Sequence, residues 1–164
     1  MKNILLTAVL LVPMLALPRA QADDLTCSGT ISGRSIDGNV QVRQGASCTL
    51  VNTRVDGDVK VSRGGSLILK NTQVEGNVES DDGFVRISVQ GSVIDGNIEA
   101  QRGRDVLVGD TRVGGNIELE RNTGALTVSR VTVDGNLKCE RNARTPQGGS
   151  NRVGGNREGQ CSRL

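Results

Sequence analysis

Residues 36–40 read Ile36-Asp37-Gly38-Asn39-Val40, and variants of this five-residue motif recur six more times along the chain. The later copies are Val55-Asp56-Gly57-Asp58-Val59, Val74-Glu75-Gly76-Asn77-Val78, Ile94-Asp95-Gly96-Asn97-Ile98, Val113-Gly114-Gly115-Asn116-Ile117, Val133-Asp134-Gly135-Asn136-Leu137 and Val153-Gly154-Gly155-Asn156-Arg157. Successive central glycines are 19, 19, 20, 19, 20 and 20 residues apart. So regular a period is typical of a solenoid, in which each repeat packs only against its neighbours.

Each repeat predicts short strands that are separated by tight corners. Apolar residues lie two positions before and two positions after the central glycine, and this alternation with a period of two is typical of β-strands. A third apolar run follows in each repeat, as at Leu67 and Leu69. Glycine and asparagine tolerate positive φ. We therefore expect corners at the motif glycine and at the residue seven positions later, which is Gly45, Gly64, Gly83, Gly103, Asn122 or Asn142.

Stacking the repeats in register would bury two continuous columns of apolar side chains. The first column would contain Ile36, Val55, Val74, Ile94, Val113, Val133 and Val153, and the second Val40, Val59, Val78, Ile98, Ile117 and Leu137. The predicted fold is all-β: a single-stranded right-handed parallel β-helix, or β-solenoid, of about seven coils of 19–20 residues. Right-handedness is expected because parallel crossover connections strongly prefer it.

Residues 1–22 have the features of a secretory signal peptide. Lys2 precedes an apolar run over residues 4–17, and the segment ends in Ala20-Gln21-Ala22. The apolar run is shorter than the roughly 20 residues that a membrane-spanning helix needs. We therefore expect cleavage after Ala22 and a β-helix domain over residues 23–164. The mature protein would be secreted or periplasmic, with no membrane insertion.

Charge and composition exclude several classes of function. The predicted signal contains two of the 20 Lys and Arg residues and none of the 18 Asp and Glu residues, so the mature chain is formally neutral. A neutral chain lacks the basic surface that nucleic-acid binding requires, and no nucleic-acid partner is expected. The sequence has no His, Trp or Tyr and a single Phe, Phe84. It therefore lacks the commonest general base and metal ligand, and we expect no cofactor.

Four cysteines lie near the two ends of the predicted rod. Cys27 and Cys48 are 21 residues apart, and Cys139 and Cys161 are 22 residues apart. Each spacing is close to one coil, which favours Cys27–Cys48 and Cys139–Cys161 among the three possible pairings. A metal site is the alternative, although the chain contains neither a Cys-x-x-Cys motif nor histidine. The irregular segment 140–151 is expected to fold over the C-terminal end.

The residue before the motif glycine is usually acidic. Stacked coils would place Asp37, Asp56, Glu75 and Asp95 in one column about 5 Å apart, which makes them candidates for a cation site or for acids that act on a polysaccharide. The alternative is that an acidic residue before glycine simply stabilises a turn. The residue after the glycine is Asn or Asp in every copy, and stacked amides predict a hydrogen-bonded ladder.

Two further columns are candidates for binding. Arg102, Arg121 and Arg141 would stack as an anion-binding stripe, because guanidinium groups suit carboxylated or phosphorylated polymers. The alternative is that nearby glutamates, such as Glu120, neutralise the stripe. A threonine column that includes Thr72 would suit an ice-binding face, but Ser92 and Val131 interrupt it.

The repeats and the ending Gly135-Asn136-Leu137-Lys138-Cys139 … Val153-Gly154-Gly155-Asn156-Arg157-Glu158-Gly159-Gln160-Cys161 resemble those of a group of small exported bacterial proteins without an assigned activity. The short coils are more distantly similar to those of bactofilins, bacterial β-helices that polymerise end to end. Bactofilins are cytoplasmic, whereas this chain has a predicted signal peptide. The resemblance implies a monomer or an end-to-end oligomer.

These observations predict a non-catalytic exported module with a structural or binding role. The expected partner is an envelope or extracellular polysaccharide, or another protein. One alternative is a polysaccharide-acting lyase or hydrolase that uses the acidic column at Asp37, Asp56, Glu75 and Asp95. The other is a lectin-like binder of anionic glycans that uses the arginine stripe.

Overall fold

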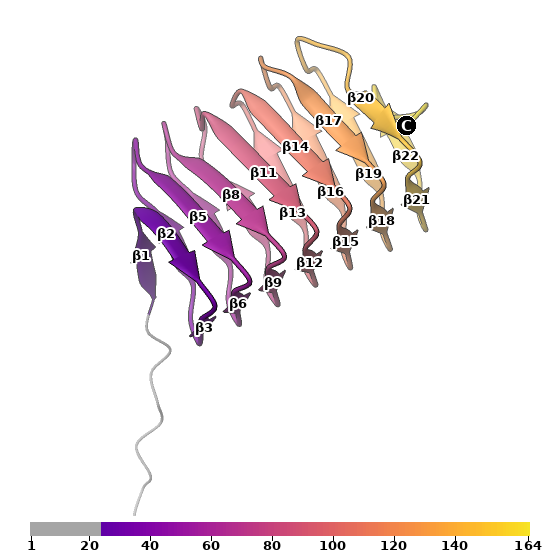
Figure 1. The fold of residues 1–164 in the computed structure, drawn as a ribbon. Coiled ribbons are helices and arrows are strands. Elements are labelled where there is room, and N and C mark those ends of the chain that lie inside the picture. Colours follow the sequence, from indigo (N-terminus) through magenta and orange to yellow (C-terminus); the bar gives the residue numbers. More distant parts are fainter. Residues whose placement is uncertain (1–23) are drawn as a thin grey trace, which may run out of the picture.

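The computed structural model describes residues 24–164, which form a rod of stacked coils (Figure 1). Each complete coil contributes one strand to each of three parallel sheets, as the sequence predicts for a β-solenoid. No helix in this part of the chain is long and apolar enough to cross a membrane. The predicted signal peptide lies outside the described residues.

The three sheets are named A, B and C in the order in which the chain visits them. The eight strands of sheet A are β1 (Leu25–Cys27), β4 (Val40–Val42), β7 (Val59–Val61), β10 (Val78–Ser80), β13 (Ile98–Gln101), β16 (Ile117–Glu120), β19 (Leu137–Glu140) and β22 (Arg157–Gly159). The seven strands of sheet B are β2 (Gly29–Ser32), β5 (Ser47–Val51), β8 (Ser66–Lys70), β11 (Arg86–Gln90), β14 (Asp105–Gly109), β17 (Leu126–Ser129) and β20 (Gln147–Gly149). The seven strands of sheet C are β3 (Ser35–Ile36), β6 (Arg54–Val55), β9 (Gln73–Val74), β12 (Val93–Ile94), β15 (Arg112–Val113), β18 (Thr132–Val133) and β21 (Arg152–Val153).

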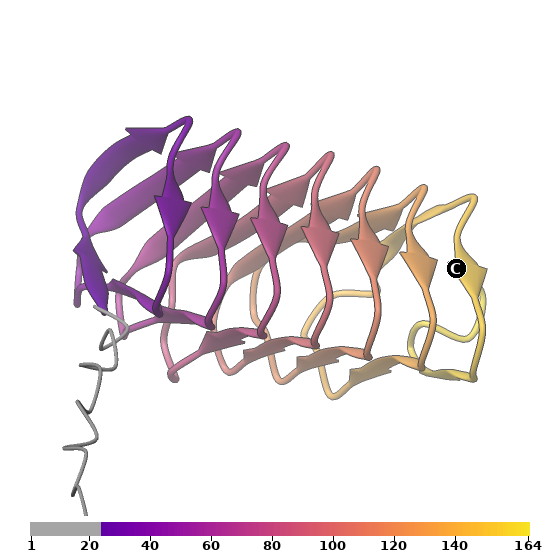
Figure 2. The same cartoon turned by 90° about the horizontal axis from the view of Figure 1, so that it is seen from below.

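The coils stack in the predicted register and wind to the right. Seen from the N-terminal end, the chain turns clockwise as it recedes (Figures 1 and 2). In sheet C, Ile36 pairs with Val55, and the column continues through every later coil to Val153. In sheet A, Val40 pairs with Val59, and this column continues to Leu137. The repeat therefore sets the pairing of all the coils.

The core is the interior of the rod, where inward-facing aliphatic side chains of the three sheets meet. On β8, Leu67 and Leu69 are fully buried, whereas the outward-facing Ile68 between them is half-buried. The same alternation holds on β5, where Cys48 and Leu50 are fully buried. Each buried aliphatic side chain contributes about 1.5–3 kcal/mol, and a column of them holds neighbouring coils together.

The predicted asparagine ladder forms the corner between sheets C and A. The side-chain oxygen of Asn77 accepts a hydrogen bond from the backbone N–H of Asn97 at 2.8 Å, and Asn97 repeats this contact with the next coil at 2.8 Å. Asp58 takes the same role toward Asn77, at 2.7 Å. The ladder comprises Asn39, Asp58, Asn77, Asn97, Asn116, Asn136 and Asn156. At its N-terminal end, Asp24 accepts hydrogen bonds from the N–H and the side-chain amide of Asn39.

The ladder also explains the central glycine of the motif. A Cβ atom on Gly96 would lie 2.5 Å from the side-chain oxygen of Asn77 and 2.6 Å from the carbonyl oxygen of Gly76. The motif glycines after the first meet the preceding coil in the same way. They are not among the residues with positive φ, so the expectation of a left-handed corner at this position is wrong. Glycine is required because the preceding coil leaves no space for a side chain.

The corner between sheets A and B changes its geometry along the rod. In the first three coils the positive-φ residue is glycine, as predicted: Gly45, Gly64 and Gly83. In the next three coils it falls one position earlier, on Arg102, Arg121 and Arg141. The prediction that Gly103, Asn122 and Asn142 adopt positive φ is therefore wrong. Their position faces inward, and the strands of sheet A extend one residue further in these coils.

Asn122 and Asn142 form a second, internal amide ladder at this corner. Asn122 donates to the carbonyl of Ala100 at 2.8 Å and accepts from the N–H of Gly103 at 2.9 Å. Asn142 accepts from the N–H of Asn122 at 2.9 Å and exchanges two hydrogen bonds with Gln160. Buried polar groups require hydrogen-bond partners, and no buried side-chain nitrogen or oxygen in residues 24–164 is left unpaired.

Phe84, the single aromatic residue, fills the interior at the point where the corner changes. Its ring is fully buried and lies against Gly103 of the following coil. A Cβ atom on Gly103 would lie 2.2 Å from the ring. The glycine at position 103 is therefore explained by packing against Phe84 and not by its backbone angles.

The sequence analysis did not identify the third corner, between sheets B and C, although its positive-φ residues form a column. They are Gly33, Asn52, Asn71, Gly91, Asp110, Arg130 and Ser150. From the second coil to the fifth, the residue after the corner points inward, which buries Thr53, Thr72, Ser92 and Thr111 to 3 % exposure or less. Thr72 donates to the carbonyl of Lys70, and its N–H donates to the hydroxyl of Ser92. The threonine column is thus an internal hydrogen-bonding column, and the ice-binding alternative is wrong.

Disulfide bonds close both ends of the rod with the predicted pairing, Cys27–Cys48 and Cys139–Cys161. The segment 140–151 does not fold over the C-terminal end as expected. Its residues Gln147–Gly149 form β20, which pairs with β17 and continues sheet B. Gly148 is required there, because a Cβ atom would lie 1.9 Å from the carbonyl oxygen of Val128. The absence of apolar residues hid this strand from the sequence analysis.

Candidate functional site

The acidic column predicted from the motif lies on the corner beside sheet C. Asp37, Asp56, Glu75 and Asp95 are all exposed. Arg54 of β6 contacts two of them: its Nε lies 3.0 Å from Oδ1 of Asp56, and its Nη2 is hydrogen-bonded to Glu75. Further along the rod, Arg112 contacts Asp134 at 2.6 Å. Two arginines of sheet C thus compensate Asp56, Glu75 and Asp134, whereas Asp37 and Asp95 make no ion pair within residues 24–164.

This arrangement differs from a cation site. Within residues 24–164, no group of three or more His, Cys, Asp or Glu side chains is placed to hold a metal ion. One guanidinium group lies between Asp56 and Glu75, where a cation or a shared proton would have to sit. The geometry therefore suits a line of surface ion pairs, which stabilise the corner by about 0–1 kcal/mol each.

The arginine stripe is present on the corner between sheets A and B, and it carries its own counter-charges. Arg102 makes a bidentate contact with Asp82 at 2.9 and 3.0 Å. Arg121 and Arg141 both contact Glu120, at 3.6 and 3.3 Å. The structure brings the three arginines together as predicted, but it also places carboxylates beside them. Glu120, which was expected to neutralise the stripe, is one of these carboxylates.

The sequence analysis missed a column of glutamates on the outer face of sheet A. Glu79, Glu99 and Glu118 lie on successive strands in direct register. Lys60 precedes them in this column and Lys138 follows them. Each residue stands three positions after a motif glycine, so comparing that position across the repeats would have revealed the column.

The glutamate column perturbs its central member. Partial burial, together with the negative charges of Glu118 and Glu79, raises the pKa of Glu99 above its ordinary value. Like charges on directly opposed residues of neighbouring strands are destabilising. The column is thus a local electrostatic cost within an otherwise compensated surface.

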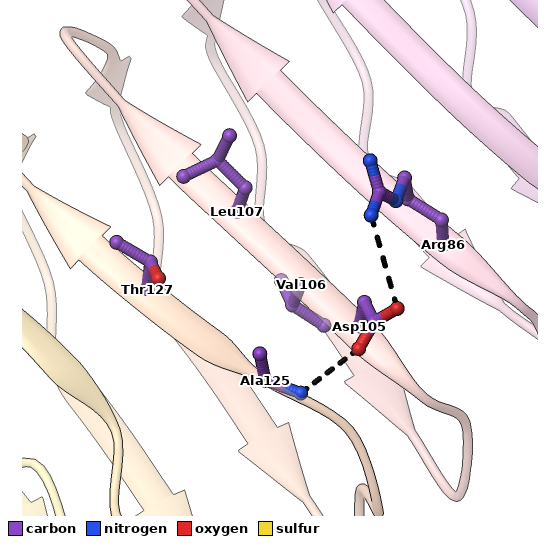
Figure 3. Close-up of a pocket in the computed structure, with 6 residues that line it drawn as sticks. All are labelled: Arg86, Asp105, Val106, Leu107, Ala125 and Thr127. Carbon is purple, nitrogen blue, oxygen red and sulfur yellow. Dashed lines mark hydrogen bonds and ion pairs between the residues drawn. The ribbon is translucent and has the colours of Figure 1, made fainter.

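Sheet B carries a shallow hollow on its outer face (Figure 3). One depression of about 370 Å³ is lined by Arg86, Asp105, Val106, Leu107, Ala125 and Thr127. A second depression of about 440 Å³ is lined by Ala125, Leu126, Thr127, Arg144, Thr145 and Gln147. The two depressions lie side by side and share Ala125 and Thr127 in their linings, and we name them together the sheet B hollow. The sequence analysis predicted none of it.

Asp105 anchors the floor of the sheet B hollow. Its Oδ1 accepts a hydrogen bond from the N–H of Ala125 at 2.9 Å, in place of a backbone acceptor. Its Oδ2 lies 3.9 Å from the guanidinium group of Arg86, and both contacts are drawn in Figure 3. The carboxylate of Asp105 therefore stabilises the start of β17, and it neutralises Arg86 only weakly.

Charge is distributed unequally over the three outer faces. The strands of sheet A contain six of the seven glutamates. The strands of sheets B and C contain a single carboxylate, Asp105, and five basic residues, Arg54, Lys70, Arg86, Arg112 and Arg152. The outer faces of the rod thus differ in the sign of their charge.

Comparisons with protein-family models, with curated proteins and with solved structures find no match to this chain.

Proposed function

We propose that this chain is a non-catalytic, exported structural or binding module of the bacterial envelope or secretome. The observation that carries the proposal is the uniformity of the coils. Their motif glycines are spaced 19 or 20 residues apart, and the coils build three parallel sheets that run the length of the rod. Such a rod offers extended faces to a partner.

The local chemistry supports the same proposal. The acidic column, which includes Asp56, has the residue types of a catalytic site, and the arginine stripe, which includes Arg102, has those of an anion-binding site. Both contain internal ion pairs. Arg54 contacts the carboxylates of both Asp56 and Glu75, so these groups are already engaged within the protein. The polysaccharide-acting alternative therefore receives no support from the acidic column.

The cysteines and the N-terminal segment support the proposed location. Two disulfide bonds fit an oxidising environment, which the periplasm and the extracellular space provide. The signal peptide predicted over residues 1–22 would deliver the chain there. The resemblance of the repeats to those of small exported bacterial proteins supports the same compartment, and the chain would act there as a monomer or an end-to-end oligomer.

The proposal is tested by incubating the mature, oxidised protein with a panel of acidic and neutral envelope polysaccharides. Chain length is then measured by size-exclusion chromatography. We expect no shortening of any polysaccharide, with or without retention of the polymer by the protein. Shortening that disappears in an Asp56→Asn variant, while an Asp110→Asn variant remains active, would establish a catalytic acidic column and overturn the proposal.

A further inference from the structure

The sheet B hollow runs along the axis of the rod and across its strands. It extends from Arg86 on β11, over β14 and β17, to Gln147 on β20. Neighbouring strands are about 4.8 Å apart, so the hollow spans roughly 14 Å. This length suits a segment of a linear polymer that lies parallel to the rod axis.

The two ends of the hollow carry arginines that are available to a ligand. Arg86 has one charged partner in the described chain, Asp105 at 3.9 Å, which is beyond hydrogen-bonding distance. Arg144 makes no ion pair or side-chain hydrogen bond with any described residue. Some arginines elsewhere on the rod, such as Arg102 and Arg130, are bound to carboxylates, whereas others, such as Arg34 and Arg152, make no ion pair within residues 24–164. A guanidinium group binds a carboxylate with two parallel hydrogen bonds, so the arginines at the two ends of the hollow favour an anionic ligand.

Short apolar and polar side chains line the hollow between the arginines. Ala125 and Leu107 form a low apolar floor, and Thr127, Thr145 and Gln147 supply hydroxyl and amide groups. The only aromatic ring of the protein, Phe84, is fully buried, so sugars cannot stack on an aromatic surface here. Recognition in this hollow would depend on charge and hydrogen bonds.

An extended peptide fits the hollow less well than a glycan. Peptides add to sheets along an exposed edge, whereas the hollow crosses strands whose backbone groups are already paired on both sides. A peptide also advances by about 3.3 Å per residue, which does not match the 4.8 Å strand spacing. The rise per sugar residue of a linear glycan is close to the distance between neighbouring coils. We infer that the sheet B hollow binds a linear carboxylated glycan, and this inference rests on the proposed role as a non-catalytic binding module.

The test measures the affinity of the mature, oxidised protein for a galacturonate oligosaccharide by isothermal titration calorimetry at low ionic strength. The double variant R86Q/R144Q removes both arginines of the hollow. The matched control R34Q/R152Q removes two exposed arginines beside or on sheet C that also lack an ion pair in the described chain. We expect the hollow variant to bind at least about tenfold more weakly and the control to match the unmodified protein. Circular dichroism verifies that both variants retain the β-solenoid.

Several outcomes would overturn the inference. These are no binding to the unmodified protein, equal losses in the two double variants, equal affinity for the methyl-esterified oligosaccharide, or tighter binding of a polyglutamate peptide, which would identify an acidic peptide as the ligand. The length of the oligosaccharide is measured after each titration. Shortening would overturn the proposed function, whereas a failure of the binding measurements alone would overturn only the assignment of the hollow.

Discussion

The side-chain oxygen of Asn97 accepts a hydrogen bond of 2.8 Å from the backbone N–H of Asn116 in the next coil. This contact replaces a backbone acceptor at a corner, where strand pairing is interrupted. The neighbouring Gly115 and Ile117 donate instead to backbone carbonyls, those of Gly96 and Asn136. One side-chain amide per coil thus completes the hydrogen bonding between neighbouring coils at this corner.

Replacing Asn97 with alanine should remove the acceptor for the N–H of Asn116. An unpaired backbone donor in this half-buried corner costs about 1–3 kcal/mol, so the free energy of unfolding should fall by that amount. Asn97→Asp should destabilise the protein less, because Asp58 already fills the same position in an earlier coil. Urea denaturation of the oxidised protein measures both variants. Equal losses for Ala and Asp would contradict a role for the side-chain oxygen.

Gly103 and Phe84 should be energetically coupled. Gly103→Ala would place a methyl group inside the Phe84 ring, and overpacking of this kind costs about 1–3 kcal/mol or more. Phe84→Leu alone should also destabilise the core, since it leaves a cavity beside Gly103. The double variant should lose less stability than the sum of the two single variants. As a control, Gly109→Ala should be nearly neutral, because its new methyl group would meet Ser129 at 3.8 Å, an ordinary contact distance.

Each disulfide should stabilise its own end of the rod. Each bond closes a loop of about one coil, which corresponds to about 3 kcal/mol in the chain-entropy model. Replacing Cys139 and Cys161 with alanine should increase hydrogen exchange in β19 and β22 and leave β4 and β7 protected. Replacing Cys27 and Cys48 should give the opposite pattern. Uniform loss of protection in both variants would show that the rod unfolds as one unit, with no local stabilisation of the ends.

Glu99→Gln should stabilise the protein at neutral pH. The pKa of Glu99 is raised in the folded state by partial burial and by Glu118 and Glu79, so the folded protein holds this proton more tightly than the unfolded chain. The ionised carboxylate therefore costs stability above the folded pKa, and the cost disappears as the pH falls below the ordinary glutamate value.

The effect of Glu99→Gln should be below about 1 kcal/mol, because the side chain is half-buried and salt screens its neighbours. Thermal unfolding from neutral to acidic pH should show the difference between the variant and the unmodified protein closing. Glu140→Gln serves as a control, since Glu140 is paired with Lys138 at 3.8 Å and its loss should give no gain. A gain that persists at low pH would point to packing and not to charge.

The columns were more predictable than the corners. The positions two residues before and after each of the first six motif glycines form the two buried columns that the alternation predicted, because a period of two allows only one face to point inward. Corner geometry could not be read in this way. Asn122 looks like a turn residue, yet it is buried and Arg121 takes the positive φ instead. Its amide is more favourable inside, where Gly103 and Ala100 satisfy it.

The candidate surfaces, too, could be predicted only in part from the sequence. Both predicted charge columns exist, because stacking of equal coils follows from the repeat alone. Their charge compensation depends on side chains from other columns, such as Arg54 beside Asp56 and Glu75. The sheet B hollow depends on how residues of different coils, Arg86 and Arg144 among them, lie on one face. No local motif encodes that arrangement.

The sequence by itself determined the parallel β-solenoid, its register and both disulfide bonds. It could do so because a repeat with a 19- or 20-residue period and one apolar face has a single way to bury that face. Only the tertiary structure decided where the backbone turns, which charges cancel and which side chains line the sheet B hollow. Those properties arise between coils and between columns, where residues distant in the sequence compete for the same space and the same hydrogen bonds.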